Sequence, residues 1–153
     1  MAQNSLIEYS GNLMLFVASG STAGTKIPIA FSTSAKLNIT MKTRDTTNKD
    51  DGAFGSKSYG RIAWDMSSDA LMSFSTTGST YSVEDLWGMM LAHTLIYPVF
   101  GHISGSSAPY TLDTAKKYFQ GSAYITSLPL TAGNDDNGTF SITLEGAGAL
   151  VLT

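Results

Sequence analysis

The chain has 153 residues, a formal net charge of −3, no cysteine and only 14% charged residues. Its length fits one domain, residues 1–153, that buries about two-thirds of the surface of the unfolded chain. The charge gives no basic field for nucleic acid, and the missing cysteine excludes disulfides, thiolate catalysis and cysteine-based zinc sites. Serine, threonine and glycine are abundant instead, which is typical of a mainly β protein with many turns. So few charges also favour association between molecules.

The first apolar run, residues 13–18, predicts a strand rather than a membrane span. It is too short to cross a bilayer and has no basic leader before it, so we expect no membrane contact and no general secretion. Residues 13–17 are apolar without alternation, which indicates a strand buried on both faces.

Alternation of apolar and polar residues predicts further strands in the first half of the chain. Residues 35–42 give the clearest half-buried strand, and residues 62–66 give another. Residues 27–31 alternate around a proline, whose missing N–H indicates a sheet edge. We expect residues 71–74 to extend the sheet.

A long loop is predicted over residues 43–61, which have neither a helical nor a strand period. Loops of this length in a compact domain are usually functional or disordered. Phe54 and Tyr59 are poorly suited to a solvated loop and are typical of anchors that become buried when a loop orders against a partner. The alternative is a surface insertion without a partner.

One helix is predicted over residues 82–94. Ser82 and Asp85 form a variant of the capping box, and apolar residues follow with a helical period. The stripe expected to face the core consists of Val83, Leu86, Trp87, Met90 and Leu91. Gly88 inside the helix costs about 1 kcal/mol relative to alanine. Such a helix would cover one flank or mouth of a β-sandwich.

The second half predicts a strand over residues 95–103 that is broken by Pro98, and then a long antiparallel hairpin. The hairpin pairs residues 123–128 with residues 139–145 across a turn rich in glycine and asparagine. Its second strand alternates strictly, with one apolar face and one polar face. The polar face consists of Thr139, Ser141, Thr143 and Glu145.

The chain ends in an apolar segment that includes Leu150, Val151 and Leu152. Because chain ends normally fray into water, we expect this segment to pair with a strand of its own sheet or of a neighbouring molecule.

Candidate catalytic and metal-binding residues are few. His93 and His102 are the only histidines, and two isolated histidines make an improbable metal site. The glycine-rich residues 20–26 lack the lysine spacing of a phosphate loop. Neither Gly52 nor Gly138 can be the invariant glycine of a calcium loop, because the ligand positions around each are wrong. We therefore expect no cofactor and no enzymatic activity.

Four segments carry a resemblance to a known family. Residues 46–52 read Thr-Thr-Asn-Lys-Asp-Asp-Gly, residues 59–65 read Tyr-Gly-Arg-Ile-Ala-Trp-Asp, and residues 121–128 and 139–148 follow with matching order and spacing. Together they resemble the major tail protein, or tail tube, family of long-tailed phages. The resemblance implies an antiparallel β-sandwich or barrel of tail-tube type with one flanking helix. It also implies that the added C-terminal domain of some relatives is absent after Gly148.

The same resemblance implies a structural virion protein that assembles in the host cytoplasm. Its copies would form hexameric rings that stack into a tail tube and conduct double-stranded DNA, without specific binding, during genome ejection. Tape measure, terminator and baseplate proteins would be its partners. The residues expected at contacts between subunits are Arg44, Thr47, Lys49, Asp50, Phe54, Tyr59 and Arg61.

The candidate lining of the tube lumen consists of Thr139, Ser141, Thr143 and Glu145. The apolar C-terminal segment is a further candidate contact between subunits. The alternative function is a monomeric β-sandwich that binds carbohydrate. In that case Tyr59, Tyr110 or Tyr124 would stack on sugar rings.

Overall fold

The computed structural model describes residues 10–74, 79–107 and 110–153. After a short 3-10 helix, Ser10–Asn12, the elements are β1 (Leu13–Ser19), β2 (Lys26–Pro28), β3 (Ser32–Asp45), β4 (Lys57–Leu71), α1 (Val83–Leu91), β5 (Ile96–Ser104), β6 (Thr111–Leu112), β7 (Phe119–Gln120), β8 (Ala123–Ser127), β9 (Leu130–Thr131), β10 (Thr139–Gly146) and β11 (Val151–Leu152). Strands dominate, and α1 is the one α-helix of the described residues. This confirms the predicted fold class.

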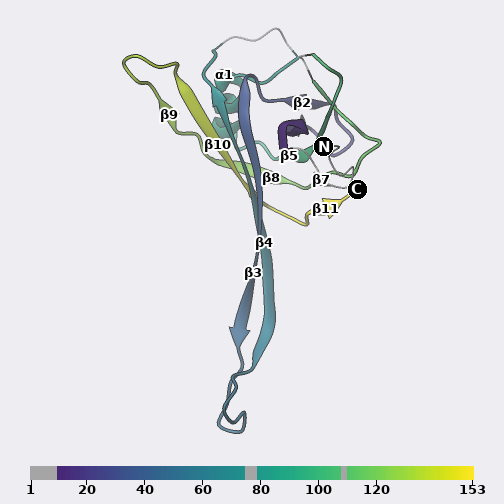
Figure 1. The fold of residues 1–153 in the computed structure, drawn as a ribbon, viewed down its shortest axis with the longest axis vertical. Helices are drawn as coiled ribbons and strands as arrows, with labels where there is room; N and C mark the ends of the chain where they lie inside the picture. Colours follow the sequence, from purple (N-terminus) through teal and green to yellow (C-terminus); the bar gives the residue numbers. More distant parts are fainter. Residues whose placement is uncertain (1–9, 75–78, 108–109) are drawn as a thin grey trace, which may run out of the picture.

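The strands form one antiparallel sheet that does not close into a barrel. Its main path runs β11-β7-β5-β8-β10-β4-β3, while β1 and β6 pair with β5, β2 pairs with β1, and β9 pairs with β10. The predicted hairpin is confirmed, because β8 and β10 pair from Ala123 opposite Gly146 to Ser127 opposite Thr143. The path therefore ends at β11 on one side and at β3 on the other (Figure 1).

The hydrophobic core lies between the inner face of this sheet and α1. Strand β10 contributes the predicted apolar face, and β4, β8 and β1 add to it. The buried side chains include Leu15, Val17, Trp64, Met66, Ile125, Phe140, Ile142 and Leu144. Val83 and Leu86 enter this core from the first turns of α1.

Helix α1 is shorter than the predicted range of residues 82–94. Its start is as predicted, because Ser82 and Asp85 form a complete capping box. The helix ends at Leu91 because His93 adopts a left-handed conformation with φ of 52°. The N–H of Thr94 donates to the carbonyl of Met89 and that of His93 to Met90, which is the Schellman arrangement that ends a helix.

The predicted core stripe of the helix is wrong for two residues. Val83 and Leu86 are buried, but Trp87 and Leu91 are 53% and 65% exposed. The buried face of the helix follows Val83, Leu86 and the partly buried Met89 and Met90, so Trp87 and Leu91 lie beside it on the exposed side. Met90 packs partly buried at its margin.

The predicted loop over residues 43–61 is largely a β-hairpin. Strand β3 continues to Asp45 and β4 begins at Lys57, so only residues 46–56 form the connecting loop. A bulge hides the strand period, because Met41 pairs with Ile62 whereas Thr43 pairs with Tyr59. Residues 39–63 project from the body of the molecule as a long arm (Figure 1), called the arm below.

Two further bounds differ from the sequence predictions. Strand β4 ends at Leu71, so residues 72–74 do not extend the sheet. Strand β5 runs through Pro98 without interruption, pairing with β1 on one side. Phe31, at the end of the alternating residues 27–31, is exposed in a left-handed turn before β3.

The root of the arm is fixed by Trp64, which is 6% exposed. Its indole lies against Gly121 and Gly146, where an added Cβ would stand 2.4 Å and 2.3 Å from ring atoms. The indole N–H donates to the carbonyl of Gly148 over 2.8 Å. The arm, β10 and the C-terminal segment therefore meet at one side chain.

We expect the same glycine-to-alanine change to have opposite effects at two positions. Gly146→Ala should lower the free energy of unfolding by about 1–3 kcal/mol, because the new methyl group displaces the Trp64 ring. Gly88→Ala should raise it by about 1 kcal/mol, because this glycine lies inside α1 with open space around it. Urea unfolding followed by circular dichroism measures both, and a stable Gly146→Ala variant would contradict the proposed packing.

Candidate inter-subunit surfaces

The arm carries an exposed apolar stripe along one face. Ile39 and Met41 lie two residues apart on β3, and Ile62 pairs with Met41. The bulge restores Tyr59 to this same face, because Tyr59 pairs with Thr43, the next residue of that face on β3. Ile39, Met41, Tyr59 and Ile62 are 49%, 47%, 81% and 66% exposed and form what we call the apolar stripe. An isolated two-stranded hairpin with such a stripe is marginally stable in water.

The tip loop, residues 46–56, is closed by its own hydrogen bonds. The N–H of Thr46 donates to the carbonyl of Ser56 over 3.0 Å, and the N–H of Asn48 donates to the carboxylate of Asp51 over 2.8 Å. The N–H of Asp50 in turn donates to the side-chain oxygen of Asn48. Phe54 takes no part in this network and is 86% exposed.

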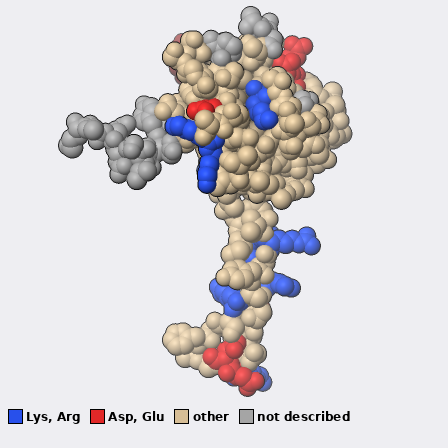
Figure 2. Space-filling view, turned by 90° about the vertical axis from the view of Figure 1, so that its right-hand side faces the viewer, with Lys and Arg blue, Asp and Glu red and all other residues tan. Residues whose placement is uncertain are grey.

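All seven residues predicted to contact a neighbour lie on the arm, from Arg44 and Thr47 to Tyr59 and Arg61. The arm is also the basic part of the chain. It has five basic residues (Lys42, Arg44, Lys49, Lys57, Arg61) and three acidic ones (Asp45, Asp50, Asp51), a net charge of +2. The remaining residues contain four basic and nine acidic side chains, a net charge of −5. Figure 2 shows the basic side chains along the shaft of the arm and acidic ones at its tip.

The residues predicted to line a lumen lie on the outer face of the sheet, opposite the core. Thr139 and Glu145 are exposed, and Ser141 and Thr143 are half-buried. Their partners on β4 continue the same face, with Ser141 opposite Asp69, Thr143 opposite Ser67 and Glu145 opposite Asp65. On β3 the face includes Ser34, Lys36 and Asn38, which pair with these β4 residues. We call these ten residues the polar face.

Side-chain hydrogen bonds link the strands across the polar face. The hydroxyls of Ser141 and Ser34 both donate to the carboxylate of Asp69. The amide of Asn38 donates to Asp65 over 3.1 Å. Because this face holds three acidic residues and one lysine, it presents no cationic cluster.

The apolar C-terminus pairs with a strand of its own chain. Strand β11 lies antiparallel to β7, and Tyr118 and Thr153 exchange two backbone hydrogen bonds just beyond this pair. Leu150 packs against the core, whereas Val151 and Leu152 remain 55% and 51% exposed. One edge of β11 is therefore left at the end of the sheet.

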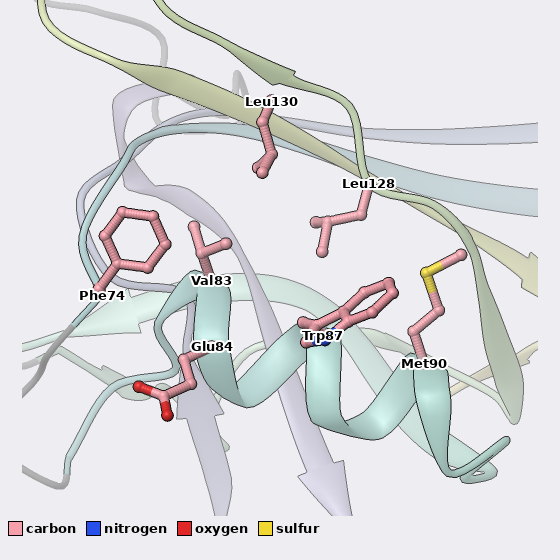
Figure 3. Close-up of a pocket in the computed structure, with 7 residues that line it drawn as sticks. All are labelled: Phe74, Val83, Glu84, Trp87, Met90, Leu128 and Leu130. Carbon is pink, nitrogen blue, oxygen red and sulfur yellow. The ribbon is translucent and has the colours of Figure 1, made fainter.

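An apolar groove lies beside α1 and was not predicted from the sequence. It has a volume of about 440 Å³ and is lined by Phe74, Val83, Glu84, Trp87, Met90, Leu128 and Leu130 (Figure 3). We call it the α1 groove. It was missed because the helical period placed Trp87 in the core. The structure shows instead that the Trp87 side chain forms part of the groove wall.

Among residues 10–74, 79–107 and 110–153, no three His, Asp or Glu side chains are grouped to hold a metal ion. Within the same ranges, no helix is long and apolar enough to cross a bilayer. Tyr59, Tyr110 and Tyr124 lie on the arm, before β6 and on β8, so they do not share one strand face.

Comparison with known proteins identifies a family. The family model described as phage tail tube protein matches residues 9–152, nearly the whole chain. A comparison of the sequence with curated proteins gives no match.

Solved structures with the same fold are assembled tubes and related particles. The tail of an empty gene transfer agent particle, refined with C6 symmetry, matches with a TM-score of 0.71 and 14% identity over 96% of this chain and 99% of that chain. The SPP1 tail tube matches with a TM-score of 0.69 and 12% identity over 96% and 79%. A chain of the six-fold anti-feeding prophage baseplate matches with a TM-score of 0.67 and 9% identity over 98% and 97%. At these identities the likeness establishes the fold.

The hydrogen bonds at the base of the tip loop make a testable prediction for Asp45. The hydroxyl and the backbone N–H of Thr47 hold the pKa of this carboxyl below its usual value. A lowered pKa means that the ionised carboxylate of Asp45 contributes to the stability of the loop base above the usual carboxyl range, and that this contribution is lost as the pH falls through the lowered value. Thr47→Ala should raise the pKa of Asp45 toward its ordinary value, whereas Thr46→Ala should leave it unchanged. Titration of the Asp45 carboxyl carbon by NMR measures this, and equal pKa values in all three proteins would refute the assignment.

Proposed function

The chain belongs to the phage tail tube protein family, and from that membership we propose that its copies form six-membered rings that stack into a tail tube. It is a structural protein of the virion tail, and we assign it no catalytic role. The C6 symmetry of the gene transfer agent tail and the six-fold symmetry of the anti-feeding prophage baseplate support the ring size.

The arm is the observation that carries this proposal. A hairpin of two strands buries little apolar surface when it folds alone. Packing its apolar stripe against a second molecule removes that surface from water and stabilises the hairpin. The stripe and Phe54 meet no partner surface on their own chain, since they are exposed. Because an arm on one copy and a receiving surface on another are different patches, the contact is heterologous and suits a repeating assembly.

The open sheet supplies the ring contacts. Its path ends at β3 and β11, so each copy has two sheet ends that neighbours in a ring can complete. Completing them removes exposed strand edges, as closing a barrel does. We place these two ends at the sides of the subunit within the ring and the arm between stacked rings.

The polar face lines the lumen in this proposal. Its hydroxyls and carboxylates, with Lys36 as the one cation among its ten residues, give a passing phosphate backbone little to bind. Double-stranded DNA could then slide through the tube without specific contacts. Baseplate, tape measure and terminator proteins would meet the tube at its ends or inside it, and a tube-terminating cap with this fold exists in the anti-feeding prophage.

Shortening the arm should separate folding from assembly. Thr40 and Ala63 pair across the hairpin, so Asn-Gly can replace residues 41–62 as a two-residue turn. The shortened chain should keep the unfolding midpoint of the body, because nothing in the core depends on the removed residues, but it should stay monomeric. Light scattering measures the oligomeric state, and negative-stain microscopy shows whether tubes form. Normal tubes from the shortened chain would overturn the role of the arm, and a wild-type monomer that binds glycans would favour the carbohydrate-binding alternative.

Reversing one charge of the polar face should affect DNA passage more than assembly. Glu145 is exposed beside Asp65, and Glu145→Lys would place a cation where phosphates pass. We expect tubes of normal length and slower genome ejection from particles that carry the variant. Asp136→Lys, the same charge change in the turn before β10, is the control. Equal ejection rates for both variants and the wild type would show that this face does not line the lumen.

A further inference from the structure

The α1 groove is an exposed apolar surface that a bound partner would stabilise by covering it. Three of its lining residues, Phe74, Trp87 and Leu130, are 64%, 53% and 52% exposed. They lie on three separate segments, yet their side chains converge on one hollow (Figure 3). Large apolar side chains gathered in this way mark interaction sites more often than isolated exposed residues do. Glu84 at the rim is the one charged residue of the lining.

The tip of the arm carries an exposed aromatic side chain. Phe54 is the most exposed large apolar residue of the described chain, at 86%. It follows Ala53 in a loop held by its own hydrogen bonds, so the aromatic ring is presented on an ordered support. Such an exposed aromatic is typical of an anchor that fills a pocket on a partner.

The two surfaces cannot meet within one molecule. The arm leaves the body and runs away from it, while α1 lies within the body (Figure 1). A second copy placed head to tail along the long axis brings the tip of one arm to the body of the next. Repetition of this contact gives an open, stacked arrangement rather than a closed dimer.

We propose that the arm tip of one copy inserts Phe54 into the α1 groove of a copy in the adjacent ring. The proposal rests on the proposed function, because it names the receiving surface for the arm. A groove of about 440 Å³ is large enough to take the phenyl ring together with a small neighbour such as Ala53.

Apolar contact rather than charge carries this docking. The tip loop, residues 46–56, holds Lys49 with Asp50 and Asp51, a net charge of −1, and the lining of the groove includes the acidic Glu84. The basic residues of the arm lie mainly along its shaft, so they do not enter the groove with Phe54. We therefore expect the contact to depend on the burial of Phe54 and only weakly on salt.

The natural absence of cysteine permits a direct test by cross-linking. Ala53→Cys and Leu130→Cys chains, both of which keep Phe54, are mixed, assembled into tubes and oxidised. Because a disulfide forms only when the two Cα atoms lie within about 7 Å, covalent dimers should appear in the mixture and not with either chain alone. A chain carrying both changes should give a ladder of covalent multimers. Leu152→Cys, exposed on β11, replaces Leu130→Cys in the control and should give no dimers with Ala53→Cys.

The outcomes separate the two proposals. Tubes that form with no cross-link at Leu130, nor at Phe74→Cys on the opposite wall of the groove, overturn the docking site and leave the tube function standing. Cross-links to Leu152→Cys alone would also overturn it. Failure of the wild-type chain to form tubes would refute the tube function, and the docking site with it.

A fluorescence measurement checks the same contact without cysteine. Trp64 is already buried, so a blue shift of tryptophan emission on assembly reports Trp87 in the groove wall. The shift should be lost in Phe54→Ala and kept in Phe31→Ala, a change of another exposed phenylalanine away from the arm and the groove. An unchanged shift in tubes of Phe54→Ala would mean that something other than the arm tip covers the groove.

Discussion

The seating of Trp64 on two glycines is the contact on which the rest of the molecule depends. Its indole occupies the space that side chains at Gly121 and Gly146 would fill, and it binds the carbonyl of Gly148. The arm has only two strands, so its direction is set where β4 enters the core. One buried ring therefore ties the arm to β10 and to the C-terminal segment. A change at this point would alter where every arm residue is presented.

The body and the arm differ in how much of their apolar surface is buried. The body buries Met66, Ile142 and Leu144 completely, so it has a hydrophobic core of its own. The arm leaves Ile39, Met41 and Ile62 in water, which a monomer would avoid. Together with the opposite net charges of the two parts, this imbalance favours contact between the arm of one copy and the body of another. The distribution of exposed apolar and charged residues in each subunit therefore favours assembly.

The sequence predicted those parts of the fold in which strand or helix periods are unbroken. Strict alternation around Ile142 predicted β10 and both of its faces, and Ser82 with Asp85 predicted the helix start. For residues 43–61 of the arm the sequence predicts a loop instead of strands, because the bulge near Gly60, where an added Cβ would stand 2.2 Å from the Lys42 carbonyl, interrupts the alternation. The sequence nevertheless grouped the residues expected to contact neighbouring copies in one segment, which lies on the arm. The α1 groove escaped prediction because the helical period does not distinguish Met89 and Met90, which pack against the core, from Trp87, which lies exposed beside them.

In the proposed tube, the low charge and many hydroxyls of the polar face would suit a surface that conducts DNA. Serine and asparagine side chains hold the carboxylates of Asp69 and Asp65 in fixed positions between strands. Groups that are already hydrogen-bonded to one another are less ready to exchange partners with a passing polymer than free long-chain cations are. Lys36 is the one exception among the ten residues of this face, since the other basic residues of the hairpin lie farther out on the arm. The separation of basic residues onto the arm and hydroxyls onto the sheet therefore serves both proposed roles, because the charges that favour contact between copies are kept away from the path of the DNA.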